Sequence, residues 1–498
     1  MALIQITDLT FAYPGSFDPV FEHVSFQLDT DWRLGLTGRN GRGKTTLLRL
    51  LQGQYPHQGT ITAPGGFEYF PYPIPDAALT PLELLERSFP DVPQWRLRRE
   101  LAPLFVTDDA LYRPFSTLSG GEQAKILLAL LFAREGRYLL IDEPTNHLDE
   151  TGRALVSRYL AKKSGFLLVS HDRAFLDGCV DHILSINRGG IEVQKGNFSS
   201  WYENRQRQDA FELAQNAQLK KEIGRLKQAA RQSRAWADKV ENTKIGPHSA
   251  KVTGEADAMG GRAYIGEQSR RMQQRRKNLE RRQSAAIEEK SALLKNIEQA
   301  APLKLHQLPY HTDRLALLRD VSVCYGGAPV CRGVSFCVEQ GDRIALRGAN
   351  GTGKTSLLRL LCGEDVPHTG TVERSSRLRI SCVRQDPSGL RGDLGAYAAR
   401  YGLDESLFKA ILRKLDFARV QFEKDMVDFS AGQKKKVLLA RSLCEPSHLL
   451  VWDEPLNYVD VLSRMQIEDL LLEFRPTIVF VEHDRVFCDH VATKAVLL

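Results

Sequence analysis

Short runs of apolar residues alternate along the chain with segments in which apolar residues recur every three or four positions. The short runs include 32–38 (WRLGLTG), 137–143 (RYLLIDE) and 165–172 (GFLLVSHD), and the periodic segments include 44–52 (KTTLLRLLQ) and 122–133 (EQAKILLALLFA). Continuous apolar runs are typical of strands that are buried on both faces, and the periodic segments are typical of helices packed against them. The pattern predicts an α/β fold with a parallel sheet between layers of helices.

The same pattern occurs twice. Residues 38–51 recur as 348–361, 141–149 as 452–460, and 169–175 as 481–487, so that the spacing stays between 310 and 312 residues. A spacing that is constant over a whole domain indicates two copies of that domain. We predict one copy at 1–203 and the other at 310–498, called the first and second repeat below.

The linker between the repeats, residues 204–309, has a helical pattern of its own. Helix-forming residues predominate from 204 to 244, and a Gly-rich tip follows at about 245–262. Coiled-coil seam positions are Leu219, Ile223, Leu226, Ala230, Ser233, Ala237 and Val240 before the tip, and Ile265, Met272, Leu279, Ala286 and Leu293 after it. The linker is therefore predicted to be an antiparallel α-helical coiled-coil hairpin about 60 Å long.

Positive charge is concentrated in this linker. The chain has a net charge of +7, whereas residues 203–290 alone contain 20 Lys and Arg against 12 Asp and Glu. Basic helices such as 270–282 suit an RNA phosphate surface, and the alternative is the solvated face of a coiled coil. The concentration of charge in one segment favours RNA.

Composition narrows the class of protein further. The chain is 42% hydrophobic and 26% charged, and its apolar runs stay far below the roughly 18 residues of a membrane span. Its start has no basic segment followed by an apolar run. The eight cysteines are scattered without a CxxC pair, as expected for ordinary thiols in a reduced compartment. We expect a cytoplasmic protein that does not cross a membrane.

Each repeat contains a GxxxxGK[ST] loop between a predicted strand and a predicted helix. Glycines let the backbone surround phosphates, N–H groups at the helix start face the anion, and the lysine neutralises phosphate oxygens. The predicted ATP-binding residues are Gly38, Asn40, Gly41, Gly43, Lys44, Thr45 and Thr46 in the first loop, and Gly348, Asn350, Gly351, Gly353, Lys354, Thr355 and Ser356 in the second. Thr45 and Thr355 are expected to ligate Mg²⁺.

A pair of acidic residues ends a later strand in each repeat. Asp142 and Asp453 are placed where they can hold Mg²⁺. Glu143 and Glu454 can orient or deprotonate water for attack on the γ-phosphate. The alternative, that these acids cap a helix, does not explain their recurrence beside two phosphate loops.

The segment LSGGEQ at 118–123 resembles the signature of the ATP-binding cassette superfamily. The resemblance implies that Ser119, Gly120 and Gly121 complete the ATP site of the second repeat, and that Ser430 and Gly432 complete that of the first. The chain would then act as a monomer in which ATP joins the two repeats head to tail. The resemblance also assigns His171 and His483 to γ-phosphate contact, Tyr13 and Tyr325 to adenine stacking, and Gln385 to Mg²⁺.

Two positions depart from the superfamily pattern. Tyr72 stands where the first repeat should have the glutamine that matches Gln385, and Ala431 replaces a glycine in the second signature. Tyrosine cannot copy an amide's contact with Mg²⁺. We therefore expect two hydrolysis-competent sites of unequal rate.

Two cassettes joined by a basic helical hairpin, with DEPTNHLD at 142–149 and GNFSSWYENR at 196–205, resemble the ABC-F family and within it the Lsa-type resistance proteins. The resemblance implies binding to the bacterial ribosome near 23S rRNA and the P-site tRNA. It also implies protection against lincosamides, streptogramin A and pleuromutilins, with hydrolysis driving release. Alternatives are a housekeeping translation factor, the ATPase subunit of a drug transporter, and a DNA-repair or chromosome-structuring ATPase.

The linker tip is the candidate effector of this activity. Lys251 can meet phosphate, and Val252, Met259 and Tyr264 are the residues most able to act sterically on a drug. The alternative is that the tip is a passive turn.

Overall fold

The computed structural model describes residues 2–15, 19–146, 148–187, 190–244, 274, 281–282, 285, 305, 307–325, 328–417 and 419–498. For residues 230, 233–244 and 328 the structure describes the backbone alone. The chain divides into one compact unit, Met1–Trp201 with Ala300–Leu498, and another, Tyr202–Gln299. Both repeats therefore lie in the first unit.

The first repeat is built on two sheets. The larger sheet has the strand order β5-β6-β7-β3-β8-β9, in which all neighbours are parallel except the last pair, and the smaller antiparallel sheet has the order β2-β1-β4. The strands are β1 (Leu3–Phe11), β2 (Phe21–Asp29), β3 (Arg33–Thr37), β4 (Gln58–Thr62), β5 (Phe67–Phe70), β6 (Tyr138–Asp142), β7 (Phe166–Val169), β8 (His182–Asn187) and β9 (Gly190–Lys195).

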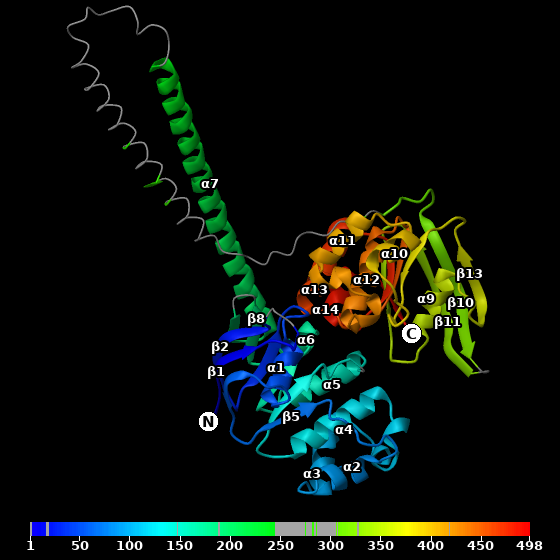
Figure 1. Ribbon diagram of the computed structural model, residues 1–498. Coiled ribbons are helices and arrows are strands. Elements are labelled where there is room, and N and C mark those ends of the chain that lie inside the picture. The colour runs from blue at the N-terminus through cyan, green and yellow to red at the C-terminus, as the bar shows by residue number, and fades with distance from the viewer. Residues whose placement is uncertain are drawn as a thin grey trace, which may run out of the picture. The chain divides into compact units, whose positions relative to one another are not determined.

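The apolar runs of the sequence form the central strands. Strands β6 and β7 are buried along almost their whole length, as expected for strands covered on both faces. The helices are α1 (Lys44–Leu51), α2 (Pro81–Ser88), α3 (Gln94–Leu101), α4 (Gly120–Ala133), α5 (Glu150–Leu160) and α6 (Arg173–Cys179), with 3₁₀ turns at Ala102–Leu104, Asp108–Tyr112 and Phe115–Thr117. The predicted α/β architecture is confirmed (Figure 1).

The second repeat has the same plan. Its parallel sheet has the order β14-β15-β16-β12-β17, and its antiparallel sheet has the order β11-β10-β13. The strands are β10 (Arg314–Tyr325), β11 (Ala328–Glu339), β12 (Arg343–Arg347), β13 (His368–Arg374), β14 (Ile380–Val383), β15 (Leu449–Asp453), β16 (Ile478–Val481) and β17 (Lys494–Leu497). The helices are α9 (Lys354–Cys362), α10 (Leu394–Arg400), α11 (Glu405–Lys414), α12 (Ala431–Cys444), α13 (Val461–Phe474) and α14 (Arg485–Val491), with 3₁₀ turns at Arg419–Glu423 and Met426–Asp428.

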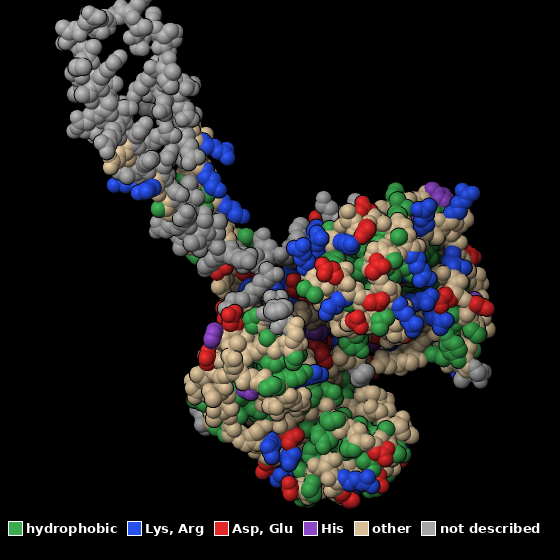
Figure 2. Space-filling view, viewed as in Figure 1, with side chains coloured by type: hydrophobic (Ala, Val, Ile, Leu, Met, Phe, Trp, Pro, Cys, Tyr) green, Lys and Arg blue, Asp and Glu red, His purple; other side chains and the backbone are tan. Residues whose placement is uncertain are grey.

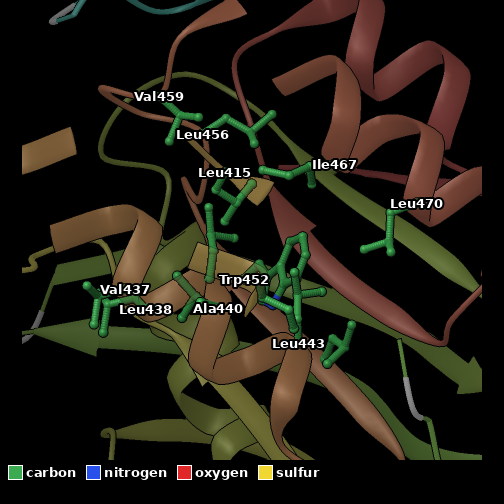
Figure 3. Close-up of a cluster of buried hydrophobic side chains, with 14 of the residues drawn as sticks. Leu415, Val437, Leu438, Ala440, Leu443, Trp452, Leu456, Val459, Ile467 and Leu470 are labelled. Atoms are coloured by element: carbon green, nitrogen blue, oxygen red, sulfur yellow. The ribbon is translucent and has the colours of Figure 1, made fainter. Parts of the chain in front are cut away.

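A continuous apolar cluster surrounds Trp452 in the second repeat (Figure 3). Leu443 from α12 and Ile467 from α13 belong to the same cluster, and all three side chains are fully buried. The Trp452 indole N–H donates to the Ser442 hydroxyl at 2.9 Å, so its polar group is satisfied within the cluster. This packing fixes the strand that carries Asp453 against the helix that follows the second signature.

The linker begins with one long helix, α7 (Phe198–Lys244), drawn in green in Figure 1. Its first turn is anchored by the buried side chains of Phe198 and Trp201. Farther along, the predicted seam residue Ile223 is only 7% exposed. No helix in the described part of the chain is long and apolar enough to cross a membrane.

Several predictions about the linker fall outside the described residues. These are the tip at 245–262, with Lys251, Val252, Met259 and Tyr264, and the seam positions at 265, 272, 279, 286 and 293. The antiparallel hairpin therefore stays a prediction from the sequence.

Two cysteines differ from the expectation of free thiols. The structure joins Cys362, at the end of α9, to Cys382 in β14 by a disulfide. The two residues are 20 positions apart, and the pairing arises because α9 packs beside the sheet that contains β14. The spacing of cysteines in the sequence does not indicate that Cys362 and Cys382 lie close together.

Candidate nucleotide-binding and hydrolysis sites

The two glycine loops have the same backbone shape. Each loop joins a central strand, β3 or β12, to the following helix, α1 or α9. Gly43 and Gly353 precede these helices with φ of 90° and 86°, a left-handed conformation that favours glycine. A Cβ atom at Gly43 would also lie 2.6 Å from Cγ1 of Val20. The sequence is therefore constrained to glycine where the loop turns into the helix.

The lysine of each loop points back over the loop. Lys44 Nζ donates to the Gly38 carbonyl at 2.7 Å and to Asn40 Oδ1 at 3.2 Å. Lys354 Nζ donates to the Gly348 carbonyl at 2.9 Å. Burial lowers the pKa of both lysines. Both ammonium groups thus lie inside the loop that the sequence assigns to phosphate binding.

In the first repeat, two hydroxyl groups hold the carboxyl group of Asp142. Tyr69 donates its hydroxyl to Asp142 Oδ2 at 2.9 Å, and Thr45 Oγ1 lies 3.4 Å from the same oxygen. Burial raises the pKa of Asp142. Thr45 and Asp142, which the sequence assigns to Mg²⁺, are therefore adjacent, whereas Tyr69 was not among the predicted residues.

Glu143 follows Asp142 in a strained backbone conformation, with φ of 50°. Its Oε1 lies 3.2 Å from Nε2 of His171, so the predicted acid and histidine are adjacent. Burial and the neighbouring Asp142 raise the pKa of Glu143 to about 8. A carboxyl group whose pKa lies near neutrality can both accept and release a proton there, as general acid–base catalysis requires.

The second repeat surrounds its acids differently. Gln385 Nε2 donates to Glu454 Oε2 at 2.8 Å, Asn457 Nδ2 donates to the same oxygen at 2.6 Å, and His483 Nε2 lies 3.3 Å from Oε1. Burial alone would raise the pKa of Glu454, but the hydrogen bonds from His483 and Gln385 outweigh it and lower the pKa. Glu454 also has a positive φ, 45°. The two predicted catalytic glutamates therefore have opposite pKa shifts.

Strand register identifies the residue that stands in place of Gln385. Phe70 pairs with Ile141 in the first repeat as Val383 pairs with Trp452 in the second, so Tyr72 is the counterpart of Gln385. The Tyr72 ring packs against Phe89 with centroids 5.0 Å apart. The match of Tyr72 to Gln385 that the sequence suggests is thus consistent with the strand register. Tyr69, three residues earlier, makes the contact with Asp142.

Each signature serine caps the helix that follows it. The Ser119 hydroxyl accepts from the Glu122 N–H at the start of α4, and the Ser430 hydroxyl accepts from the Gln433 N–H at the start of α12. Both caps are reciprocal, since the side chain of the third residue accepts from the serine N–H. These contacts fix helix starts whose free N–H groups suit an anion.

The first glycine loop contacts the second signature region. Asn40 Nδ2 donates to the Tyr458 carbonyl at 2.9 Å. Gly432 lies beside this contact, because a Cβ atom there would be 2.4 Å from the Tyr458 oxygen and 3.2 Å from Asn40 Nδ2. Arg39 Nη1 of the first repeat lies 3.9 Å from Asp416 Oδ1 of the second repeat. These are contacts of the kind that a head-to-tail arrangement of the repeats predicts.

The second glycine loop and the first signature are more exposed than the first loop and the second signature. Asn350 in the second loop is exposed whereas Asn40 is half-buried, and Gly121 of the first signature is half-buried whereas its counterpart Gly432 is buried. A charged contact on that side joins Arg485 Nε to Glu150 Oε1 at 3.9 Å. The two pairings of loop and signature therefore differ in this structure.

Both predicted adenine-stacking tyrosines lie beside the glycine loops. The Tyr13 hydroxyl is 2.7 Å from Thr46 Oγ1, and the Tyr325 hydroxyl is 3.1 Å from Ser356 Oγ. The residues are 39% and 44% exposed. Each ring is thus tethered at its hydroxyl and leaves surface available to a base.

The doubly repeated fold and these two sites define a tandem ATP-binding cassette ATPase. A family model described as ABC transporter matches residues 21–69 and 331–457. The chain is therefore a nucleotide-binding enzyme with two cassettes, each containing a phosphate loop and an acidic strand end.

Comparison with known proteins narrows this class. The chain is 26% identical to ribosome protection protein VmlR of Bacillus subtilis, over 99% of this chain and 87% of that protein. It is 25% identical to energy-dependent translational throttle protein EttA of Escherichia coli, over 95% of this chain and 88% of that protein. The chain is a homologue of the ABC-F proteins.

A solved structure shows the same fold. In the complex of archaeal ribosomal stalk protein aP1 with the ribosome recycling factor aABCE1, the matched chain aligns with a TM-score of 0.62 at 18% identity. The alignment covers 98% of this chain and 87% of that chain. At this identity the likeness concerns the fold alone.

Proposed function

We propose that this chain binds the bacterial ribosome and protects it from antibiotics of the peptidyl-transferase centre, namely lincosamides, streptogramin A and pleuromutilins. The observation that carries the proposal is the charge on α7. Five exposed basic residues lie within about three turns of this helix, with one acid, Glu222, among them. They are Lys220, Lys221, Arg225, Lys227 and Arg231. Lys and Arg side chains are visible on this part of the helix in Figure 2. A helix of this kind suits a phosphate backbone.

The relatives support a partner in translation. VmlR is named a ribosome protection protein and EttA a translational throttle protein, and their identities to this chain are 26% and 25%. A housekeeping translation factor is therefore the second candidate, favoured by the similarity to EttA. The linker tip separates the two candidates, since in the first it would reach the drug site at the P-site tRNA and 23S rRNA.

The residues at both sites suit Mg²⁺ with ATP. Hard oxygen donors are available at each site, and Asp453 Oδ1 is buried without a hydrogen-bond partner among the described residues. Thr45 and Asp142 would hold the ion in the first site, and Thr355, Gln385 and Asp453 in the second. When bound, Mg²⁺ supplies charge neutralisation at the phosphate oxygens.

Within each site, different residues would bind ATP and position the water for hydrolysis. Lys44 and Lys354 bind phosphate, Tyr13 and Tyr325 stack on adenine, and the signature serines of the opposite repeat close the site. Glu143 and Glu454 orient the attacking water, with His171 and His483 beside them at 3.2 and 3.3 Å. ATP then joins the repeats while the factor is on the ribosome, and hydrolysis separates them and releases it.

A drug-susceptibility experiment tests the proposal. A sensitive bacterial host expressing the chain should tolerate at least about fourfold more lincosamide or pleuromutilin, while efflux of a fluorescent substrate stays unchanged. The double variant Glu143→Gln, Glu454→Gln should lose this protection and sediment with ribosomes, because ATP is bound but not hydrolysed.

Two outcomes would contradict the proposal. If the double variant sediments free of ribosomes, ribosome binding is wrong. If it sediments with ribosomes but the wild-type chain confers no tolerance, the housekeeping function replaces protection. A variant in which 246–260 is shortened to a minimal turn serves as a control, since it should lose tolerance and keep its ATPase rate.

A further inference from the structure

A buried lysine connects the second signature helix to the second pair of acids. Lys435 lies in α12, and its side chain is completely buried. Its Nζ donates to the Arg384 carbonyl at 2.8 Å and to the Asp453 carbonyl at 3.3 Å. Arg384 immediately precedes Gln385, which itself donates to Glu454. One ammonium group therefore ties α12 to both backbone segments that position the second hydrolysis site.

The same helix faces the first ATP site at its N-terminus. Its cap Ser430 and its residue Gly432 belong to the signature segment that lies against Asn40 of the first glycine loop. The next lysine, Lys436, is also buried and donates to Asp460 Oδ2 at 2.9 Å. Burial lowers the pKa of Lys44 in the first loop, and the negative charge of Asp460 opposes that shift. Lys435 thus contacts backbone of the second site, and the next residue, Lys436, contacts Asp460 on the side of the first site.

The first repeat has no equivalent of this connection at the matching position. The signatures align at a spacing of 311, which places Ala124 opposite Lys435. Ala124 is buried and has no side-chain donor. In that repeat the Tyr69 hydroxyl, from strand β5, contacts the acid instead. The connection from a signature helix to an acidic strand end therefore runs in one direction, from the first site to the second.

Burying an ammonium group is costly unless it is fully hydrogen-bonded. A side chain that is retained there, and bound only to the backbone of catalytic segments, transmits any shift of α12 directly to those segments. We propose that Lys435 is a positioning residue that makes hydrolysis in the second ATP site depend on nucleotide in the first. This inference rests on the assignment of the two ATP sites made above and does not involve the ribosome.

Steady-state ATPase kinetics of variants of the purified full chain test the proposed role of Lys435. In a Glu143→Gln background, only the second site hydrolyses ATP. There, Lys435→Met should lower kcat about tenfold, as expected for the loss of hydrogen bonds from a charged donor, and change KM less than twofold. In a Glu454→Gln background, which reports the first site, the same substitution should leave kcat within twofold.

Coupling itself is measured by adding Lys44→Ala, which removes the phosphate-binding lysine of the first site. In the chain that retains Lys435, Lys44→Ala should lower the second-site kcat at least fivefold. In the chain that carries Lys435→Met, adding Lys44→Ala should lower it less than twofold, because the connection is already lost. Lys434→Met changes a lysine of the same helix that is not fully buried, so it is the matched control and should preserve the dependence.

Each result bears on the inference. Additive effects of Lys44→Ala and Lys435→Met, or equal losses at both sites, would overturn it. If Lys435→Met lowers the unfolding midpoint, Lys435→Gln keeps a donor at the same position and should restore most of the coupling. Loss of all ATPase activity in the Glu143→Gln background alone would contradict the site assignment rather than the role of Lys435.

Discussion

Single residues make the two hydrolysis sites chemically different. The carboxyl group of Asp142 accepts from the Tyr69 hydroxyl, whereas the strand position equivalent to Tyr69 in the second repeat is Cys382. Glu143 has a pKa raised to about 8, and Glu454 has a lowered pKa because Gln385 and His483 stabilise its charge. From these neighbours we predict that the two sites hydrolyse ATP at unequal rates.

The Tyr69 contact leads to a prediction about the first site. Tyr69→Phe should lower kcat of this site roughly tenfold, because a hydrogen bond to a charged group contributes about 1.5 kcal/mol. The measurement is steady-state ATPase in a Glu454→Gln background, with KM expected to change less than twofold. Tyr72→Phe is the matched control, since its ring packs on Phe89. Equal losses in the two variants would refute a specific role for Tyr69.

Among the elements, α7 combines a fixed start with a basic middle. Phe198 and Trp201 are buried, and the Ser199 N–H donates to Asp177 Oδ1 at 2.8 Å. Exposed Lys and Arg side chains gather between Lys220 and Arg231, whereas the turns before them expose mainly Gln and Ala (Figure 2). The helix is thus held at one end and presents positive charge in its middle.

If α7 contacts RNA, its affinity must depend on salt in proportion to the phosphates it neutralises. The variant Lys221→Gln, Arg225→Gln should reduce the slope of log K against log[salt] for ribosome binding by roughly 2. Arg377→Gln, Arg391→Gln removes two exposed charges from the second repeat as a control and should leave the slope unchanged. The binding is measured by sedimentation at several salt concentrations. An identical slope for both variants would argue against an RNA contact by α7.

Across the whole ATPase unit, two ion pairs join the repeats with different burial. Arg173 of α6 pairs with Glu468 of α13, and both side chains are at least 90% buried. Arg485 and Glu150 lie 3.9 Å apart, and their side chains are 69% and 49% exposed. Without Arg173 the buried Glu468 would keep one partner, the half-exposed His490, whose Nδ1 lies 2.6 Å from its Oε1, so the loss is large but not complete. An exposed pair contributes little.

Substitution of Arg173 should therefore destabilise the protein more than substitution of Arg485. Arg173→Met should lower the unfolding midpoint by about 3 to 4 °C, corresponding to a loss of about 3 kcal/mol over a unit of roughly 400 residues. Arg485→Met should shift it by less than about 2 °C. Adding Glu468→Gln to Arg173→Met should recover part of the loss, because the remaining buried charge is removed. The midpoints are measured by thermal unfolding of the purified chain. Equal shifts for the two arginine variants would contradict the predicted difference between the buried and the exposed pair.

The two repeats, their α/β fold and the positions of the glycine loops and acids can all be predicted from the order of residues. These features depend on local order, a strand followed by a loop and a helix, and on a spacing that identical folds preserve. Three other features emerge only in the folded chain: the contact of Tyr69 with Asp142, the reach of Lys435 to Asp453, and the opposite pKa shifts of the two glutamates. Burial and hydrogen bonding at these atoms come from side chains on other elements, whose proximity the chain acquires only when the sheets and helices pack.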